Sequence, residues 1–88
     1  MTTLATLDAL PVGRTGRVMR LDLGPADSQR LMELGLTRGT PVTVVKLAPL
    51  GDPIEILVRG SCLSVRKTLA RHVEVEQAGP DEDGRPAP

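Results

Sequence analysis

The chain contains no phenylalanine, tyrosine or tryptophan among its 88 residues. Proteins that bind single-stranded nucleic acid stack the bases on aromatic side chains, so this means of binding is absent. Eleven basic residues are balanced by eleven acidic ones, which leaves no net charge to attract nucleic acid or an anionic membrane. We therefore expect no nucleic-acid partner, and we interpret the basic group of Arg66, Lys67 and Arg71 as a solvated face.

Cysteine and histidine are equally scarce, with Cys62 and His72 the single examples of each. One cysteine cannot form a disulfide within the chain, which fits a reducing compartment. A single cysteine and a single histidine also exclude zinc-finger spacing, and the glycine-rich motifs of nucleotide-binding proteins are missing. A Cys–His nucleophile pair is formally open, but we interpret both residues as parts of strands. We expect neither an enzyme nor a tightly bound cofactor.

Long apolar runs are missing as well. No stretch approaches the roughly 20 apolar residues that cross a bilayer, and residues 1–10 lack the basic start and apolar centre of a signal peptide. We expect a soluble, cytoplasmic protein.

The chain has instead many small aliphatic residues, with 13 leucines, 9 valines and 2 isoleucines. They fall into short segments separated by glycine and proline, which predicts strands at 16–21, 40–48, 54–58, 63–65 and 72–76. Five such strands form a small, mostly β domain that closes into a barrel, because closure removes exposed edges. The barrel is expected over residues 1–76. Residues 77–88 are rich in proline, glycine and acids, and predict a disordered tail.

One α-helix is expected between the first two of these strands, at residues 25–34. Pro25 suits a first helical position, and Gly35 suits the left-handed conformation that ends a helix, with Leu31 and Leu36 in contact across the cap. A short helical turn is expected at 67–71, before the last strand. In the second strand the apolar positions change phase after Val44, which predicts either a bulge or a strand that is covered on both sides.

Three apolar residues lie where the core does not need them, and we predict that they bind a partner. Leu50 lies at a loop tip, Leu57 is out of phase with its inward neighbours, and Met32 lies away from the face that Leu31 and Leu34 are expected to bury. The alternative is that Leu50 covers the end of the barrel and Met32 is merely tolerated at the surface.

His72, Glu74 and Glu76 alternate along the last strand and so share one face. Histidine and carboxylates bind zinc or iron, although such a face is more often only solvated. We predict at most a weak divalent metal site at His72 and Glu74, shared between two molecules in a metal-bridged homodimer.

Several motifs together resemble the FeoA family. They are the helix exit Leu-Met-Glu-Leu-Gly-Leu-Thr-Arg-Gly-Thr at 31–40, the run Ala-Pro-Leu-Gly-Asp-Pro-Ile-Glu at 48–55 with Val-Arg-Gly at 58–60, and the opening Leu-Pro-Val-Gly at 10–13 with Gly16. Cys62, Ser64 and the tail depart from the family pattern.

The resemblance implies an SH3-like barrel without catalytic residues. It also implies an accessory or regulatory role in bacterial ferrous iron uptake, in which the protein docks on FeoB, a membrane permease with a cytoplasmic GTPase domain. The protein would then reach the membrane only through that partner. Two alternatives are a stand-alone module like the SH3-like domain of metal-dependent repressors, and a nucleic-acid-binding small barrel.

Overall fold

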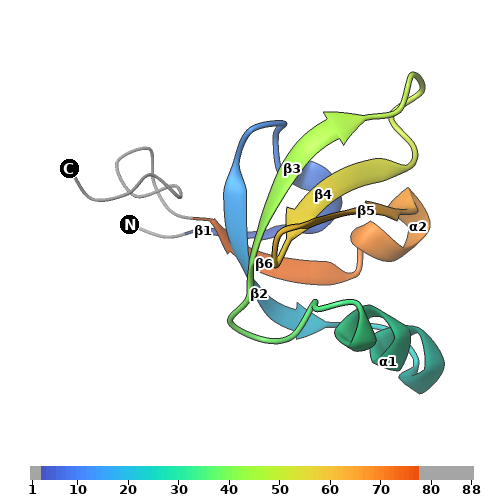
Figure 1. The fold of residues 1–88 in the computed structure, drawn as a ribbon. Coiled ribbons are helices and arrows are strands. Elements are labelled where there is room, and N and C mark those ends of the chain that lie inside the picture. Colours follow the sequence, from blue (N-terminus) through green and yellow to red (C-terminus); the bar gives the residue numbers. More distant parts are fainter. Residues whose placement is uncertain (1–2, 78–88) are drawn as a thin grey trace.

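The computed structural model describes residues 3–77, and β-strands dominate this part of the chain (Figure 1). In chain order its elements are β1 (Thr3–Thr6), the 3₁₀ turn η1 (Leu7–Ala9), β2 (Thr15–Leu21), α1 (Pro25–Glu33), β3 (Pro41–Leu47), β4 (Ile54–Val58), β5 (Ser61–Val65), α2 (Lys67–Ala70) and β6 (Val73–Gln77). All the predicted strands and both predicted helices are present. β6 includes Gln77, one residue past the predicted boundary, and the rest of the predicted tail lies outside the described residues.

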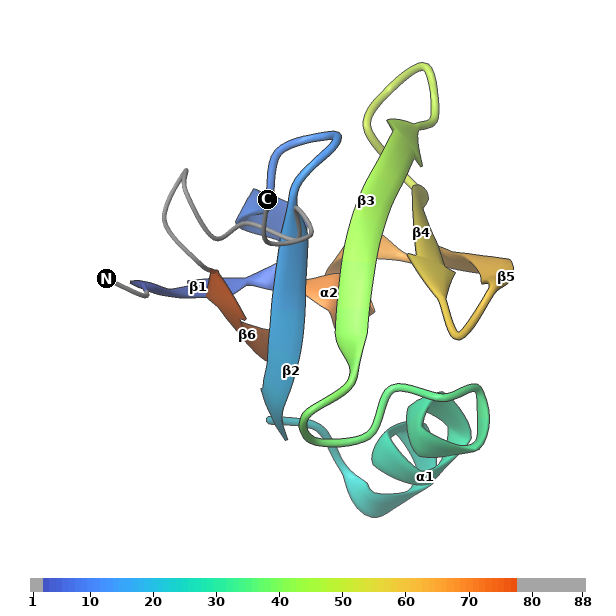
Figure 2. The same cartoon turned by 60° about the vertical axis from the view of Figure 1, so that its left-hand side comes forward.

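The six strands form one antiparallel sheet in the order β1-β6-β2-β3-β4-β5. The sheet curls strongly (Figures 1 and 2), while β2 stays paired along its length with β6 and at its start with β3. The predictions of five strands and a closed barrel are both wrong. β6 pairs with β1 on one side and β2 on the other, so it does not return to β5, and β1 and β5 remain edge strands within residues 3–77. β1 escaped prediction because its four residues, Thr-Leu-Ala-Thr, carry little apolar signal.

Two bulges help to bend the sheet. The pairing of β3 with β4 shifts register between Val44 and Lys46, which confirms the predicted bulge. A second shift, between Val18 and Arg20 in β2, was not predicted. It lies at the point where β2 leaves β3 and continues beside β6 alone.

The core lies inside the curled sheet and is entirely aliphatic. The inward positions of β4 are occupied by Ile54, Ile56 and Val58, as their alternation predicts. The other buried apolar residues are Leu7, Leu10, Val18, Leu31, Leu36, Val42, Val44, Val65, Ala70, Val73 and Val75. Small branched side chains fill this narrow interior without aromatic rings.

α1 ends at Glu33, and Gly35 has a φ of +110°, which confirms its predicted left-handed conformation. The Leu36 N–H donates to the Leu31 carbonyl at 3.0 Å, and the Gly35 N–H donates to the Met32 carbonyl at 3.0 Å. These two bonds define a Schellman cap, and both leucines are buried. Leu34 is 45% exposed, so the prediction that it packs inward is wrong. Leu34 keeps helical dihedral angles, and its N–H donates to the Arg30 carbonyl at 3.2 Å, but Leu31 is the buried residue of α1, so the inward face of the helix is too narrow to include Leu34.

Arg59 connects this helix exit to the sheet. It forms the two-residue turn between β4 and β5 with Gly60, and both residues have positive φ, as tight hairpin turns require. Its Nε donates to the Gly35 carbonyl at 3.3 Å. Its Nη2 donates to the hydroxyls of Thr37, at 3.1 Å, and Thr40, at 3.3 Å. One side chain thus holds the segment after α1 against the β4–β5 hairpin.

Candidate partner-binding surfaces

Leu50 is the most exposed large apolar side chain of the described residues, at 95%. It lies at the tip of the loop between β3 and β4, which projects from one end of the sheet (Figure 1). The Gly51 N–H donates to the Ala48 carbonyl at 2.7 Å, and the Ala48 N–H donates to the Pro53 carbonyl at 3.1 Å. These bonds hold the loop without any contribution from the leucine side chain. Leu50 does not cover the end of the sheet, and its role in binding a partner stays a prediction.

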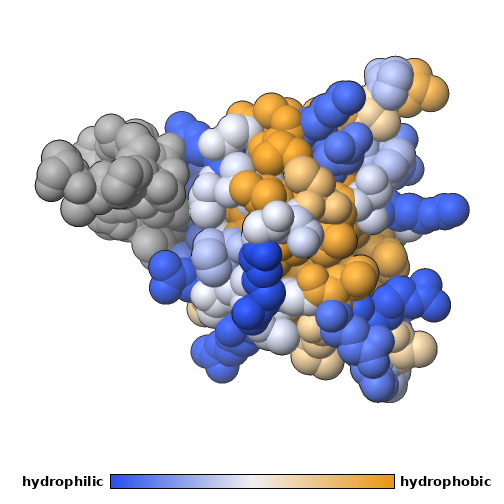
Figure 3. Space-filling model, viewed as in Figure 1, coloured by the Kyte–Doolittle hydropathy of each residue, from blue (hydrophilic) through white to orange (hydrophobic). Residues whose placement is uncertain are grey.

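Leu57 lies on the outer face of β4, between the buried residues Ile56 and Val58. It is 39% exposed and stands opposite Thr43 on β3 and Cys62 on β5. Figure 3 shows apolar surface in the region of β3 and β4, edged by charged groups. The prediction that Leu57 faces away from its inward neighbours is therefore confirmed, whereas its contact with a partner stays a prediction.

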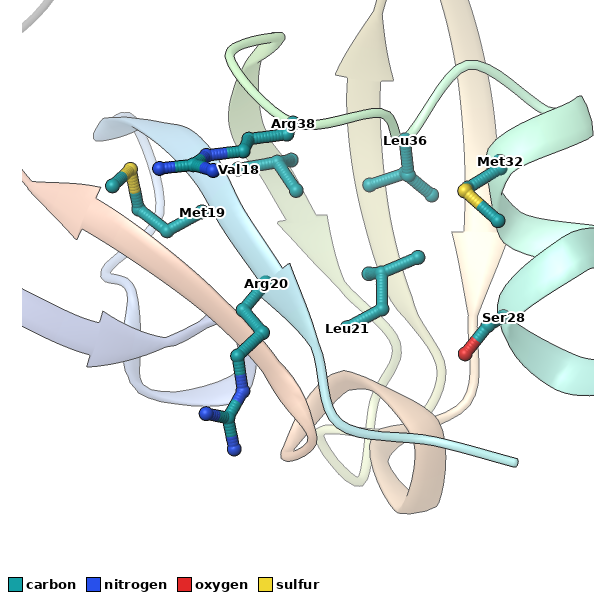
Figure 4. Close-up of a pocket in the computed structure, with 8 residues that line it drawn as sticks. All are labelled: Val18, Met19, Arg20, Leu21, Ser28, Met32, Leu36 and Arg38. Atoms are coloured by element: carbon teal, nitrogen blue, oxygen red, sulfur yellow. The ribbon is translucent and has the colours of Figure 1, made fainter. Parts of the chain in front are cut away.

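Met32 borders a groove between α1 and the second half of β2 (Figure 4). The groove has a volume of about 240 Å³ and is lined by Val18, Met19, Arg20, Leu21, Ser28, Met32, Leu36 and Arg38. Met32 and Ser28 project from the helix toward Leu21 and Leu36 (Figure 4). The Ser28 hydroxyl donates to the Leu23 carbonyl at 3.1 Å, which ties the helix to the end of β2.

The three predicted contact residues do not form one patch. The loop that carries Leu50 and the helix that carries Met32 lie at opposite ends of the sheet in both ribbon views (Figures 1 and 2). The groove was largely missed from the sequence. The sequence predicts that Met32 is exposed. Its neighbours in the groove, Leu21 and Arg38, come from separate segments that lie together only in the folded chain.

Glu74 lies on the outer side of β6, because its neighbours Val73 and Val75 are buried. His72 lies in the turn between α2 and β6, where its N–H donates to the Leu69 carbonyl at 2.9 Å, so the interpretation of His72 as part of a strand is wrong. Glu74 is opposite Arg20 and Glu76 is opposite Arg17 in the pairing with β2, which suits cross-strand charge pairs.

The Arg71 Nε donates to the Nε2 of His72 at 3.5 Å. No group of three or more metal-ligating side chains occurs within residues 3–77. A metal site at His72 and Glu74 shared between two molecules therefore stays a prediction.

Within the described part of the chain, no helix is long and apolar enough to cross a membrane.

Comparison with known proteins first defines the class of domain. The chain is similar to the FeoA protein of Chlorobium tepidum, with 38% identity over 92% of this chain and 80% of that chain, and a TM-score of 0.81. It is also similar to a zinc-complexed FeoA of Stenotrophomonas maltophilia that is described as a prokaryotic SH3 domain protein. That match has 32% identity, covers 80% of this chain and 87% of that chain, and has a TM-score of 0.69. The open, curled sheet is thus an SH3-like fold.

The sequence model of the FeoA domain family matches residues 5–77. The chain therefore belongs to the FeoA family.

A curated relative from Porphyromonas gingivalis is a fusion of Fe(2+) transport protein A with the Fe(2+) transporter FeoB. It is 30% identical over 81 residues, which are 92% of this chain. The chain spans only about a tenth of the length of that relative.

The same fold occurs in a manganese-dependent transcriptional repressor, at 18% identity and a TM-score of 0.77 over 89% of this chain and 44% of the repressor. At this identity the likeness concerns the fold alone.

Proposed function

We propose that the protein is a non-catalytic, cytoplasmic accessory protein of ferrous iron uptake that docks on a FeoB-type permease. The observation that carries this proposal is the fusion relative, in which a FeoA sequence and a FeoB sequence form one polypeptide. Fusion keeps two domains at high effective concentration, which is useful when they act on one another. The protein reaches the membrane only through its partner.

The displayed apolar side chains support a docking role. Leu50, Leu57 and Met32 are exposed although the core is complete without them, and such residues on a small domain commonly mark contact sites. Their separation favours either an extended interface or contacts with more than one part of the permease.

The test is co-purification of the tagged full-length chain with the detergent-solubilised permease of the same bacterium, with and without GTP. We expect the permease to be retained by this chain and not by an unrelated SH3-like domain of the same size. Deletion of the gene should also lower ferrous iron uptake. Absence of co-purification under both conditions, together with normal uptake in the deletion strain, would overturn the proposal.

A further inference from the structure

We propose that the groove between α1 and β2 binds an extended segment of the permease in which an apolar side chain lies beside an aspartate or glutamate. This inference rests on the proposed docking function and adds the surface and the chemistry of its occupant. Three independent features of the groove support it: a strand edge without a partner, an apolar floor and a cation at one end.

The strand edge results from the early separation of β2 from β3. Their register runs from Thr15 to Arg17, and the last bonds between the two segments join Val18 to Gly39 and Thr40, at 2.7 and 2.9 Å. Beyond this point Arg20 and Leu21 pair with β6 on one side, and no strand of residues 3–77 pairs with the other side. An unpaired edge can accept an extended peptide as an additional strand.

The floor of the groove suits an apolar side chain. Val18 and Leu36 are fully buried beneath it, Leu21 is half-buried, and Met32 is 45% exposed at its border. A volume of about 240 Å³ is smaller than the sites that hold cofactors or drug-sized ligands, and it fits one or two side chains. Methionine adapts to contacts of different shape, so Met32 can close over the inserted group.

The charge in the groove is uneven, and this gives the occupant a direction. At one end Arg20 has a carboxylate close by, with its Nη2 3.7 Å from Oδ1 of Asp22. At the other end Arg38 extends across toward Met19 (Figure 4), and no carboxylate of the described residues lies within salt-bridge distance of it. An arginine forms paired hydrogen bonds with a carboxylate, so the acidic residue of the occupant is expected at the Arg38 end.

The first test replaces Met32 with a photo-reactive phenylalanine analogue in the full-length chain and irradiates it with the solubilised permease. Leu34 is the matched control, because it is on the adjoining helix end and is equally exposed at 45% but does not line the groove. We expect crosslinks to the permease from position 32 and few from position 34, at a segment with an apolar residue next to an acid. Equal crosslinking from both positions, a segment without an acid, or crosslinks only to a second copy of this chain would overturn the proposal.

The second test reverses the charge. Arg38→Glu should weaken permease binding roughly ten-fold or more, as loss of an interface anchor does, while Arg66→Glu, at an exposed position outside the groove, should leave it unchanged. Changing the crosslinked acid of the permease to lysine should restore binding to the Arg38→Glu variant. If the wild-type chain binds but all these variants bind equally well, the groove is not the site and the docking function stands. If the wild-type chain does not bind at all, both proposals fail.

Discussion

Replacing Gly35 with alanine places a methyl group at the exit of α1, where two separate costs arise. The first is backbone strain, because φ is +110° there and a left-handed conformation costs an L-residue about 1–2 kcal/mol. The second is steric, because the new Cβ would lie 3.0 Å from Cδ and 3.3 Å from Nε of Arg59. Arg59 must then move, and its three hydrogen bonds to Gly35, Thr37 and Thr40 weaken or break.

Hydrogen bonds contribute about 0.5–1.5 kcal/mol each, so displacement of Arg59 should add about 1–2 kcal/mol to the strain. The total loss of about 2–4 kcal/mol should lower the Tm by roughly 10–30 °C, since a domain of this size loses about 4–8 °C per kcal/mol. Gly39→Ala is the matched control. Its φ is +89°, but nothing lies within 4 Å of the added Cβ, so this substitution should lower the free energy of unfolding through backbone strain alone.

The measurement is urea and thermal unfolding of the two alanine variants, followed by both changes in an Arg59→Ala background. Without the arginine side chain the two glycine substitutions should cost the same, because the steric term has gone. If Gly35→Ala and Gly39→Ala are equally destabilising in the wild-type background, the coupling between helix exit and hairpin turn does not exist.

Two further predictions concern the surface. Leu50→Asp and Leu57→Asp should each leave the Tm within a few degrees of wild type, as changes at exposed positions usually do, but should weaken co-purification with the permease and lower iron uptake; two stable variants with wild-type binding and uptake would show that these leucines are not contacts. Zinc or ferrous iron titrated into the protein and followed by calorimetry should give only weak binding that requires dimerisation and disappears in His72→Ala; a tight site in the monomer that survives this change would contradict the assignment.

The features that could be predicted from the sequence are those set by local backbone chemistry. Gly35 ends the helix because few other residues adopt its φ, and Ile54, Ile56 and Val58 face inward because strands alternate. The edge strand β1 could not be predicted, because Thr3–Thr6 becomes a strand only through pairing with β6. The exposure of Leu34 could not be predicted either, because the tertiary placement of α1 sets the width of its buried face, and Leu31 is the buried residue of that helix.

The candidate partner-binding residues could likewise be predicted only in part. The exposure of Leu50 could be predicted because it lies in a loop between proline and glycine. The exposure of Leu57 could be predicted because side chains alternate between the two faces of a strand. The groove depends on where β2 parts from β3, which in turn depends on a bulge in β2 and on the tertiary placement of α1. Arg38 gains its position from that placement, and no local pattern distinguishes it from the other arginines of the chain.

The lack of aromatic residues also determines how the protein can be followed by spectroscopy. Since the chain has no tryptophan or tyrosine, it contributes almost no ultraviolet fluorescence of its own. In a mixture with a partner that contains tryptophan, any change in emission reports on the partner alone. The core is in turn dense in the methyl groups of valine, leucine and isoleucine, so labelled methyls would give magnetic resonance probes throughout the sheet. The two partners of a complex could thus be followed separately in one sample, without attaching a dye to either.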